Sequence, residues 1–416
     1  MKNVKRKVLI IGGGASGLMA AITAARKGAQ VTILEAMEKP ARKLLMTGNG
    51  RCNLTNLDFS RKDCYRGGDP SFWQQVYTQF DEKQTMAFFE EMGLLLQKRG
   101  NGVYPLTDQA SSVADRLLLE VQKLRIKLKC QEKVVRMEQS GGHWQVYTQS
   151  WHYDADAVIL ACGSRSVPAT GSDGSGYELA KLAGHTIIQP LPALVPLKCR
   201  EGFVKKLAGL RTRADITMYV TDKNGHGTAA YTESGELQWT EYGISGIVVF
   251  QLSRYAAYAL QQGSKVQVQI DCLPSVKEET LFELLEKKMP EESISDALTG
   301  IIPKKMIAVV LELCKIKKAS ARPDAEKLQE VCRTIKQLSV SVTGTRSFEQ
   351  AQVCAGGVAT DEICPATMES RKKNDLYLTG ELLDVDGICG GYNLQWAWST
   401  GYIAGIHSAE KGEHHA

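Results

Sequence analysis

Residues that could do chemistry first occur near the N-terminus, where three glycines follow the spacing Gly12-x-Gly14-x-x-Gly17 and an acid, Glu35, stands eighteen residues further on. The first glycine permits a tight turn, the second lets a pyrophosphate approach the backbone, and the third lets a helix pack closely on a strand. The N–H groups at the start of that helix face the anion, and Glu35 can accept hydrogen bonds from an adenosine ribose. Because strand, turn, helix and acid occur in the required order, the pattern predicts dinucleotide binding rather than a structural turn alone.

A second candidate is the segment LLMTGNGRCNLTN, residues 44–56. Its glycines and asparagines favour turns and left-handed backbone, so it is typical of a shaped loop. Backbone amides at positions 48–50 can bind the middle of a long cofactor. Arg42 or Lys43, just before the loop, can lie near the pyrophosphate.

Three residues of this loop have alternative interpretations. Arg51 is either a cofactor contact or a surface charge. Cys52 is either a cofactor contact or a buried, unreactive thiol, and the second interpretation is favoured because no redox partner accompanies it. Asn53 opens a glycosylation sequon with Leu54 and Thr55, which has no role in a cytoplasmic protein.

A third candidate lies near the other end of the chain, in KNDLYLTGELLDVDGICGGYNLQWAWSTGYIAG, residues 373–405. A short apolar strand precedes Gly380 and Glu381, a turn that carries a carboxylate. Residues 390–393 open a long helix with small residues at four-residue intervals. A glycine-opened helix offers positive partial charge, which the N1/O2 edge of a reduced flavin requires.

Buried strands must position these three segments. Four apolar runs are typical of parallel strands covered on both faces: 7–11, 30–34, 155–164 and 376–379. A helix over 16–27 joins the first two. The predicted fold class is therefore α/β, with a Rossmann-like dinucleotide-binding domain built from both chain ends, residues 1–193 and 345–416.

The middle of the chain predicts an insertion into this domain. QPLPALVPL, residues 189–197, is typical of a crossing between domains because of its prolines. Residues 194–275 then predict a β-rich module of short strands, and residues 276–344 predict a small helical subdomain with two amphipathic helices. The apolar strands expected at 246–250 and 266–270 could roof an apolar cavity above a cofactor.

Composition limits the kinds of protein this can be. A chain of 416 residues with 43% apolar residues is long enough for two or three globular domains. Its 51 basic and 46 acidic residues give a net charge of +5, too small and dispersed for a nucleic-acid surface. The eleven cysteines form no C-x-x-C pair and are expected to be reduced thiols of a cytoplasmic protein. The sequence predicts no metal site, since histidines and cysteines do not cluster.

The N-terminus has the basic start and apolar centre of a secretory signal. Three glycines, Gly12 to Gly14, interrupt the apolar run, and a helical pattern continues beyond them, so we expect no signal peptide. Apolar runs fall well short of the ~20 residues of a membrane span, so we expect no membrane insertion. The sequence does not indicate an oligomeric state.

With these motifs the chain resembles the two-dinucleotide-binding-domain flavoproteins, and within them the BaiN-type NAD(P)/FAD-dependent oxidoreductase family, some members of which are aminoacetone oxidase-like. The resemblance rests on GGGASGLMAA, KLLMTGNGRCNLTN, GVYPLTDQASSVADRL, GISG, AGGV and the segment from TMESRKK to GYIAG, which together span almost the entire chain. It implies that residues 1–193 and 345–416 form a Rossmann-like FAD-binding domain that holds non-covalent FAD, with NAD(P)H as a transient electron donor. It also implies that the inserted β-rich module is β-barrel-like.

The motifs and the resemblance together predict these cofactor-binding residues: Gly12, Gly14, Ala15, Ser16, Gly17, Glu35, Ala36, Arg42, Lys43, Gly48, Asn49, Gly50, Arg51, Cys52, Asn53, Val134, Ala161, Cys162, Gly163, Gly380, Glu381, Gly391, Tyr392, Asn393 and Leu394. At two places this sequence departs from the family pattern, which limits how far the roles of the family's residues there can be assigned to this chain. Glu381 replaces the usual Asp at the contact with the ribityl chain. Glu241 and Ile247 replace the histidine and proline that many members carry around x-Gly-x-Ser-Gly.

The candidate catalytic residues are Tyr104, Glu241 and Tyr242, and each has a structural alternative. Tyr104 could donate a proton beside the flavin ring, although a tyrosine before proline in a glycine-rich loop is more often a packing residue. Glu241 and Tyr242 could face a substrate, or they could face solvent or pack within the inserted module.

Three functions remain open, since the flavin supplies the chemistry and the protein selects what meets its N5 atom. The first, which we favour, is an NAD(P)H-driven reductase of a conjugated double bond in an apolar, bile-acid- or steroid-like small molecule, as the resemblance implies. The second is an amine oxidase of the aminoacetone oxidase type. The third is a flavin-bound RNA-associated protein, against which the modest charge counts. The glycines of GSDGSGYELAK do not form a second dinucleotide motif, so NAD(P)H is expected to bind only transiently.

Overall fold

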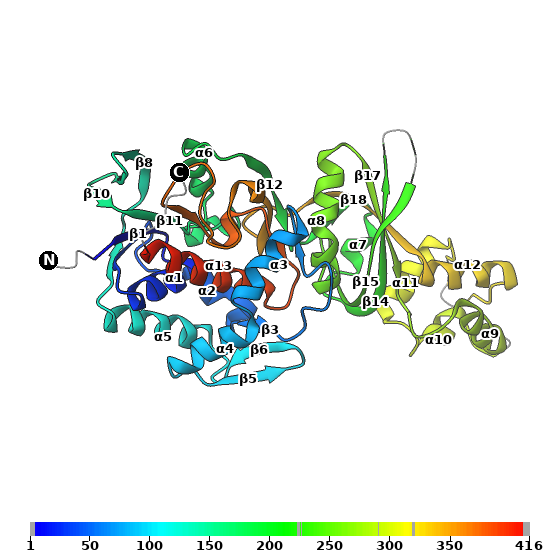
Figure 1. Cartoon of the computed structure of the whole chain (residues 1–416). Helices are drawn as coiled ribbons and strands as arrows, with labels where there is room; N and C mark the ends of the chain where they lie inside the picture. Colours follow the sequence, from blue (N-terminus) through cyan, green and yellow to red (C-terminus); the bar gives the residue numbers. More distant parts are fainter. Residues whose placement is uncertain (1–4, 223–224, 226, 290, 318–320, 411–416) are drawn as a thin grey trace. The chain divides into compact units, whose positions relative to one another are not determined.

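A computed structural model of the protein (Figure 1) defines residues 5–222, 225, 227–289, 291–317 and 321–410. The chain forms two compact units. The first contains Met1–Leu191 and Gln352–Ala416, so both ends of the chain contribute to it. The second contains Pro192–Ala351.

A five-stranded parallel sheet forms the centre of the first unit, in the order β20-β11-β1-β2-β7. Its strands are β20 Leu376–Leu378, β11 Ala157–Leu160, β1 Lys7–Ile11, β2 Gln30–Glu35 and β7 Lys127–Cys130. Strand β11 is buried at every residue, and β1 at every residue except Lys7. Parallel strands covered on both faces need continuous apolar sequence, which explains why these runs are so uniform.

The helices of the same unit are α1 Ala15–Arg26, α2 Arg42–Met46, α3 Pro70–Gln79, α4 Glu82–Glu91, α5 Ala110–Lys123, α6 Ser175–Leu182 and α13 Tyr392–Ala409. The last of them, α13, packs along α1 (Figure 1). A Cβ on Gly401 would lie 2.4 Å from the Ser16 carbonyl oxygen, and one on Gly405 would lie 2.6 Å from that of Ala20. Glycine is therefore required for this close approach, and the two helices run in the same direction.

Smaller sheets and 3-10 helices complete the first unit. The strands are β8 Val134–Ser140, β9 His143–Thr148 and β10 His152–Ala155 in one sheet; β3 Thr55–Asn56, β6 Gly102–Pro105 and β5 Leu96–Arg99 in a second; and the pairs β4 Tyr65–Arg66 with β21 Asp386–Gly387 and β12 Ile187–Ala193 with β19 Val353–Val358. The 3-10 helices are Thr47–Gly50, Pro168–Thr170, Thr360–Glu362 and Gly380–Leu382. The last two strand pairs tie the C-terminal part of the chain to earlier segments.

The second unit contains a closed barrel in the order β13-β16-β15-β14-β17-β18. Its strands are β13 Leu197–Cys199, β16 Gly243–Ser245, β15 Gly227–Thr240, β14 Arg211–Thr221, β17 Lys265–Asp271 and β18 Leu338–Thr345. The helices of this unit are α7 Phe203–Lys206, α8 Ile247–Gln261, α9 Glu278–Lys288, α10 Ile294–Leu298, α11 Lys304–Leu313 and α12 Ala325–Lys336. Barrel and helices share one hydrophobic core.

One prediction in this unit is wrong. Residues 246–250, GIVVF, are predicted as an apolar strand, but they begin helix α8. The β-branched residues favour a strand locally. The apolar pattern nevertheless continues through fifteen helical residues behind Gly246, which has a φ of +99°, and such a length favours a helix. Only 266–270, within β17, forms a strand, so the expected roof of two apolar strands does not exist.

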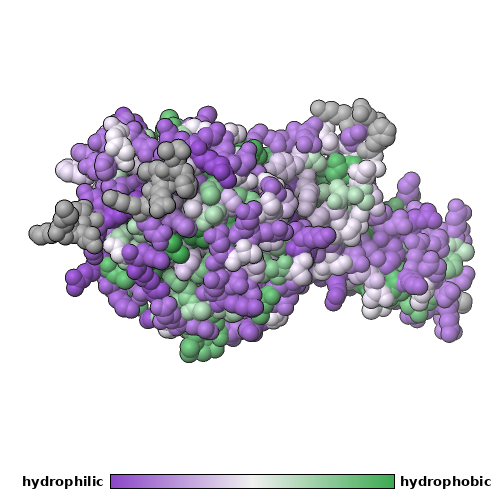
Figure 2. All heavy atoms as spheres, in the orientation of Figure 1, coloured by the Kyte–Doolittle hydropathy of each residue, from purple (hydrophilic) through white to green (hydrophobic). Residues whose placement is uncertain are grey.

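One face of the protein is largely polar. On the face drawn in Figure 2, hydrophilic residues predominate and hydrophobic residues form small separate patches. Among the described helices, none combines the length and the apolar character that a membrane crossing needs.

Candidate functional site

The glycine motif forms the turn between β1 and α1. Gly12 has a φ of +108°, and a Cβ there would lie 2.4 Å from the Ala161 carbonyl oxygen. A Cβ on Gly17 would lie 2.0 Å from the Gly12 carbonyl oxygen, so the fold itself requires glycine at both positions. Gly14 differs, because it has extended backbone and a Cβ there would meet nothing within 4 Å. The protein leaves open space at Gly14.

Glu35 lies at the end of β2, beside this turn. Its Oε2 accepts a hydrogen bond from the Gly13 N–H (2.7 Å), and its Oε1 accepts one from the Met37 N–H (2.8 Å). Burial raises the pKa of the carboxyl group, while backbone N–H groups and the charge of Arg42 act in the opposite direction. A carboxylate has further lone pairs, so Glu35 is oriented by the turn and can still accept ribose hydroxyl groups.

The loop after β2 begins with α2 and the 3-10 turn Thr47–Gly50. Left-handed backbone occurs at Gly48, Asn49, Gly50 and Cys52, whose φ angles lie between +55° and +82°, in agreement with the composition of the loop. Residues 48–51 are exposed, whereas Cys52 is buried. The backbone of 48–51 is therefore available to a ligand.

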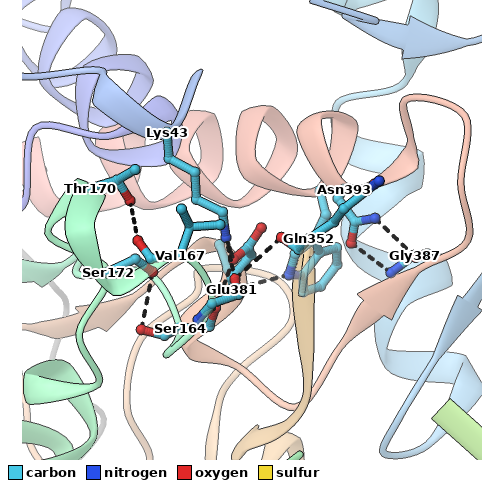
Figure 3. A network of polar contacts seen from close by, with 12 residues as sticks. Lys43, Ser164, Val167, Thr170, Ser172, Gln352, Glu381, Gly387 and Asn393 are labelled. Atoms are coloured by element: carbon cyan, nitrogen blue, oxygen red, sulfur yellow. Dashed lines mark hydrogen bonds and ion pairs between the residues drawn. The ribbon is translucent and has the colours of Figure 1, made fainter. Parts of the chain in front are cut away.

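A polar network joins this loop to the late turn that carries Glu381 (Figure 3). The Lys43 Nζ lies 2.5 Å from Glu381 Oε2 and also contacts the Ser166 hydroxyl group. The same Oε2 accepts a hydrogen bond from Ser164 Oγ (2.8 Å). Ser166 Oγ donates to the Gln352 carbonyl (3.2 Å). Glu381 is thus held by an ammonium group and a hydroxyl group from two distant parts of the chain.

Three buried serines of this network are not predicted from the sequence. Ser164, Ser166 and Ser172 are buried, and Ser172 Oγ donates to the Ser164 carbonyl (3.1 Å). Ser164 directly follows the predicted Gly163, just beyond the carboxyl end of β11. Ligands of open parallel sheets bind at such strand ends, so a polar residue within a few positions of the end of a buried strand is the signal that could identify it.

Helix α13 begins behind Gly391, which has a φ of +98°. In its first turn, Asn393 exchanges two hydrogen bonds with the backbone of Gly387: Oδ1 accepts from the N–H (2.8 Å) and Nδ2 donates to the carbonyl (2.9 Å) (Figure 3). Trp396 Nε1 donates to the Gly380 carbonyl (3.0 Å). The start of α13 is therefore fixed relative to the turn that carries Glu381.

The starts of α1 and α13 are staggered along one direction. Because Gly401 lies beside Ser16, the start of α13 at Tyr392 lies nine residues ahead of that contact, about 13 Å at 1.5 Å per residue. Each start presents free N–H groups and positive partial charge. This arrangement suits a long ligand with two polar regions, such as a pyrophosphate and a flavin ring.

The thiols at this site are protonated at neutral pH. All eleven cysteines, each within the described part of the chain, are free. Burial raises the pKa of Cys52 to about 12, and it raises that of Cys162 to about 12 as well. Because the thiolate is the nucleophile, both side chains act as small apolar groups, which supports the second interpretation of Cys52.

The remaining predicted cofactor residues lie around the same sheet end or on the surface beside it. Val134 begins β8, two residues after Glu132, whose N–H donates to the Glu35 carbonyl (2.9 Å). Arg42 and Arg51 are exposed. The carboxyl ends of β1, β2, β11 and β20 thus bring together residues that are far apart in the sequence, as parallel pairing requires.

The three catalytic candidates fall in both units. In the first unit, the ring of Tyr104 borders the loop 44–56, the proposed cofactor loop, with its Cε1 3.8 Å from the position that a Cβ of Gly48 would occupy. Glu241 and Tyr242 lie in the second unit, in the turn between β15 and β16, where the Arg346 guanidinium lies 4.5 Å from the centroid of the Tyr242 ring. Of the three, Tyr104 is the one that shares a unit with the loop.

These observations test whether a flavin dinucleotide fits. No packing contact of the fold explains the open space at Gly14, whereas a pyrophosphate needs such space to approach the backbone. The buried Oδ1 of Asn53 has no hydrogen-bond partner among the described residues, which leaves an acceptor for a ligand. Glu35 suits the ribose, and Lys43 with Glu381 suits the middle of the cofactor. The residues therefore fit FAD.

Comparisons with known proteins agree with this geometry. A family model described as HI0933-like protein Rossmann domain matches residues 6–407. The 3-dehydro-bile acid delta(4,6)-reductase of Clostridium scindens is 44% identical over 97% of this chain and 99% of its own. The ribosomal RNA dihydrouridine synthase of Escherichia coli is 29% identical over 95% of this chain and 96% of its own. A flavocytochrome c3 fumarate reductase, solved in its open conformation, is 14% identical with a TM-score of 0.50, and the match covers 97% of this chain and 78% of that one.

These findings confirm the predicted α/β fold class and the predicted cofactor, FAD. The first unit contains a Rossmann-type FAD-binding domain, and the protein is an FAD-dependent oxidoreductase. Since the family model covers nearly the whole sequence, the chain belongs to the HI0933-like Rossmann-domain family.

Proposed function

We propose that this protein is a reductase that uses NAD(P)H to reduce a conjugated carbon–carbon double bond in a steroid-like small molecule such as a bile-acid enone. The observation that carries the proposal is the 44% identity to the Clostridium scindens reductase over nearly the full length of both chains. Non-covalently bound FAD supplies hydride transfer at N5. We extend the proposal to a cytoplasmic location, which the free thiols support.

The residues of the first unit have distinct roles in this proposal. The glycine turn and Glu35 bind the adenosine half of the cofactor, and Lys43 and Glu381 hold its middle. The N–H groups at the start of α13 stabilise negative charge at one edge of the flavin ring. Conjugate reduction adds a hydride to one carbon and a proton to the carbon beside the carbonyl, and we assign that proton to Tyr104.

Two exposed apolar side chains support an apolar substrate. Leu45 and Met46 lie directly before the left-handed stretch of the cofactor loop, and they are 42% and 57% exposed. Apolar groups beside a polar cofactor site offer contact area to a hydrocarbon ring system. They are of less use to a small charged amine.

The proposal is tested by mixing FAD-loaded protein with NADH or NADPH without oxygen while flavin absorbance is followed. We expect one nicotinamide to bleach the flavin, and a 3-oxo-Δ4,6 bile acid to restore the colour faster than oxygen does. The recovered steroid should gain two hydrogen atoms by mass spectrometry. If both nicotinamides leave the flavin oxidised while aminoacetone bleaches it and peroxide forms in air, the protein is an amine oxidase instead.

A second candidate function is reduction of uridine in ribosomal RNA. The dihydrouridine synthases of Escherichia coli and Haemophilus influenzae are each 29% identical to this chain, over 95% and 96% of its length. Both candidate reactions saturate a carbon–carbon double bond conjugated to a carbonyl, so a flavin site serves either. Unmodified ribosomal RNA and the bile-acid enone should be offered separately to the reduced protein. Dihydrouridine formation without turnover of the enone would favour the RNA function.

A further inference from the structure

The carboxamide of Asn53 is a polar group that the fold does not explain. Its Oδ1 is buried and has no hydrogen-bond partner among the described residues. Folded proteins leave few buried acceptors unpaired, because an acceptor removed from water without a donor is destabilising. A ligand that brings a donor to this oxygen would remove that cost.

Two glycines make room for the amide oxygen. Oδ1 lies 3.0 Å from the position that a Cβ of Gly391 would occupy, and 3.1 Å from the corresponding position at Gly102. The ring of Tyr104 lies close by, with its Cε2 2.9 Å from the same Gly102 position. The acceptor therefore lies between strand β6 and the residue that precedes α13, at the end of the exposed stretch 48–51.

This position puts an acceptor directly beside donors. The first turn of α13 presents N–H groups that no carbonyl of the helix can accept, and Gly391 caps the helix without a side-chain hydrogen bond. The pyrimidine edge of an isoalloxazine has the complementary order, with the C2 carbonyl as acceptor next to N3–H as donor. If the C2 carbonyl of the ring accepts hydrogen bonds from the N–H groups at the start of α13, the adjacent N3–H points to the neighbouring acceptor, Asn53 Oδ1.

We propose that Asn53 Oδ1 accepts a hydrogen bond from the flavin N3–H. Asn53 is then a positioning residue that fixes the ring in its plane, and it takes no part in hydride transfer. Because N3 carries its proton in both the oxidised and the reduced flavin, the contact persists through the redox cycle. The inference rests on FAD binding and not on the identity of the substrate, so it stands or fails separately from the reductase proposal.

Two flavins and three proteins test this contact. FAD-stripped wild type, Asn53→Ala and Asn53→Asp are titrated with FAD and with N3-methyl-FAD, which lacks the donor, and Kd is measured by flavin fluorescence. Wild type should bind N3-methyl-FAD about tenfold or more weakly than FAD. Asn53→Ala should bind the two flavins within about twofold of each other, because it has lost the acceptor. Asn53→Asp keeps an acceptor and should keep the discrimination.

Asn101→Ala is the matched control, since Asn101 is an exposed asparagine between β5 and β6 and its removal should change neither Kd. Equal discrimination in wild type and Asn53→Ala would overturn the proposal and assign the acceptor to water. If Asn53→Ala takes up neither flavin, Asn53→Asp decides the question, and loss of its discrimination overturns the proposal. Kd is measured without nicotinamide or enone, so these outcomes do not depend on the reductase function.

Discussion

The turn between β1 and α1 contains glycines of two kinds. At Gly17 an added Cβ would lie 2.0 Å from a carbonyl oxygen of the protein itself, whereas at Gly14 it would meet nothing. Glycine at position 14 is therefore explained by the ligand and not by the fold. We expect Gly14→Ala to change the free energy of unfolding of FAD-stripped protein by no more than about 1 kcal/mol, while FAD binds at least tenfold more weakly.

Urea unfolding of the stripped protein and fluorescence titration with FAD measure these two effects. Gly17→Ala is the contrasting variant, and it should lower stability before any ligand is added, by about 2 kcal/mol or more. Normal FAD affinity in Gly14→Ala would mean that the motif is only a packing turn.

Tyr104 borders the cofactor loop from strand β6, and its hydroxyl group is the proposed proton donor to the substrate. Tyr104→Phe removes the hydroxyl and keeps the ring. We expect the rate of enone reduction to fall by about 10²–10⁴-fold, while the rate of flavin reduction by NAD(P)H stays unchanged. Rapid mixing separates the two half-reactions. Tyr147→Phe, in the antiparallel sheet β8–β10, is the control, and an equal loss in both half-reactions would show that Tyr104 only supports the site.

Among the elements, the 3-10 helix Thr360–Glu362 is tied to two other segments by one carboxylate. Glu362 accepts hydrogen bonds from the Thr186 N–H (2.9 Å) and hydroxyl group (2.8 Å). Its Oε2 lies 2.9 Å from His185 Nδ1, and its Oε1 lies 3.1 Å from Lys372 Nζ. His185 Nε2 is 2.8 Å from Ser370 Oγ. The end of α6 and the connection into β20 are thus joined through a polar cluster in which His185 and Ser370 are buried.

This cluster predicts sensitivity to acid. Burial lowers the pKa of His185 from its ordinary 6.5. Burial acts to raise the pKa of Glu362, but hydrogen bonds from Thr186, Lys372 and His185 lower it from 4.5 to about 2. Both folded-state values lie below the unfolded ones, so each group contributes stability at high pH that is lost as pH falls. We expect losses to begin below about pH 6.5 and to continue from about 4.5 to 2, with at most about 3 kcal/mol from Glu362.

Urea unfolding at a series of pH values measures this profile. Glu362→Gln should flatten its lower part, because the amide does not titrate. A Glu362→Gln profile that is as steep as that of wild type would contradict the assignment.

The sequence predicts some elements far better than others, for physical reasons. The parallel strands can be predicted because burial on both faces of the sheet requires uninterrupted apolar residues. Helix α8 is misread because β-branched residues carry a local strand preference that tertiary packing overrides. The contact between Lys43 and Glu381 could not be foreseen from spacing, since 338 positions separate the two residues. The unpaired oxygen of Asn53 could not be predicted either, because its burial depends on strand β6 and the start of α13, which are distant in the sequence.

For the molecule as a whole, the proposed cofactor site draws on three stretches of one unit: 12–17, 44–56 and 380–394. We expect FAD to slow backbone hydrogen exchange in all three together, because a ligand that binds only the folded state suppresses opening of every segment that it holds. Exchange measured by mass spectrometry with and without FAD tests this. Strands β14 and β17 of the barrel are the internal control and should be unchanged. Protection of only one of the three stretches would contradict the assembled site.

The order of these stretches along the chain has a consequence for synthesis. Strand β20 and helix α13 are translated after the whole second unit, yet α13 packs against α1 and belongs to the proposed cofactor site. At roughly 5–20 residues per second, the interval between Gly17 and Gly391 takes roughly 20 to 75 s on the ribosome. During that interval the glycine turn is exposed to the cell without the helix that completes its site. We therefore expect FAD capture to follow translation of α13, and the apolar face of α1 to be accessible to chaperones until then.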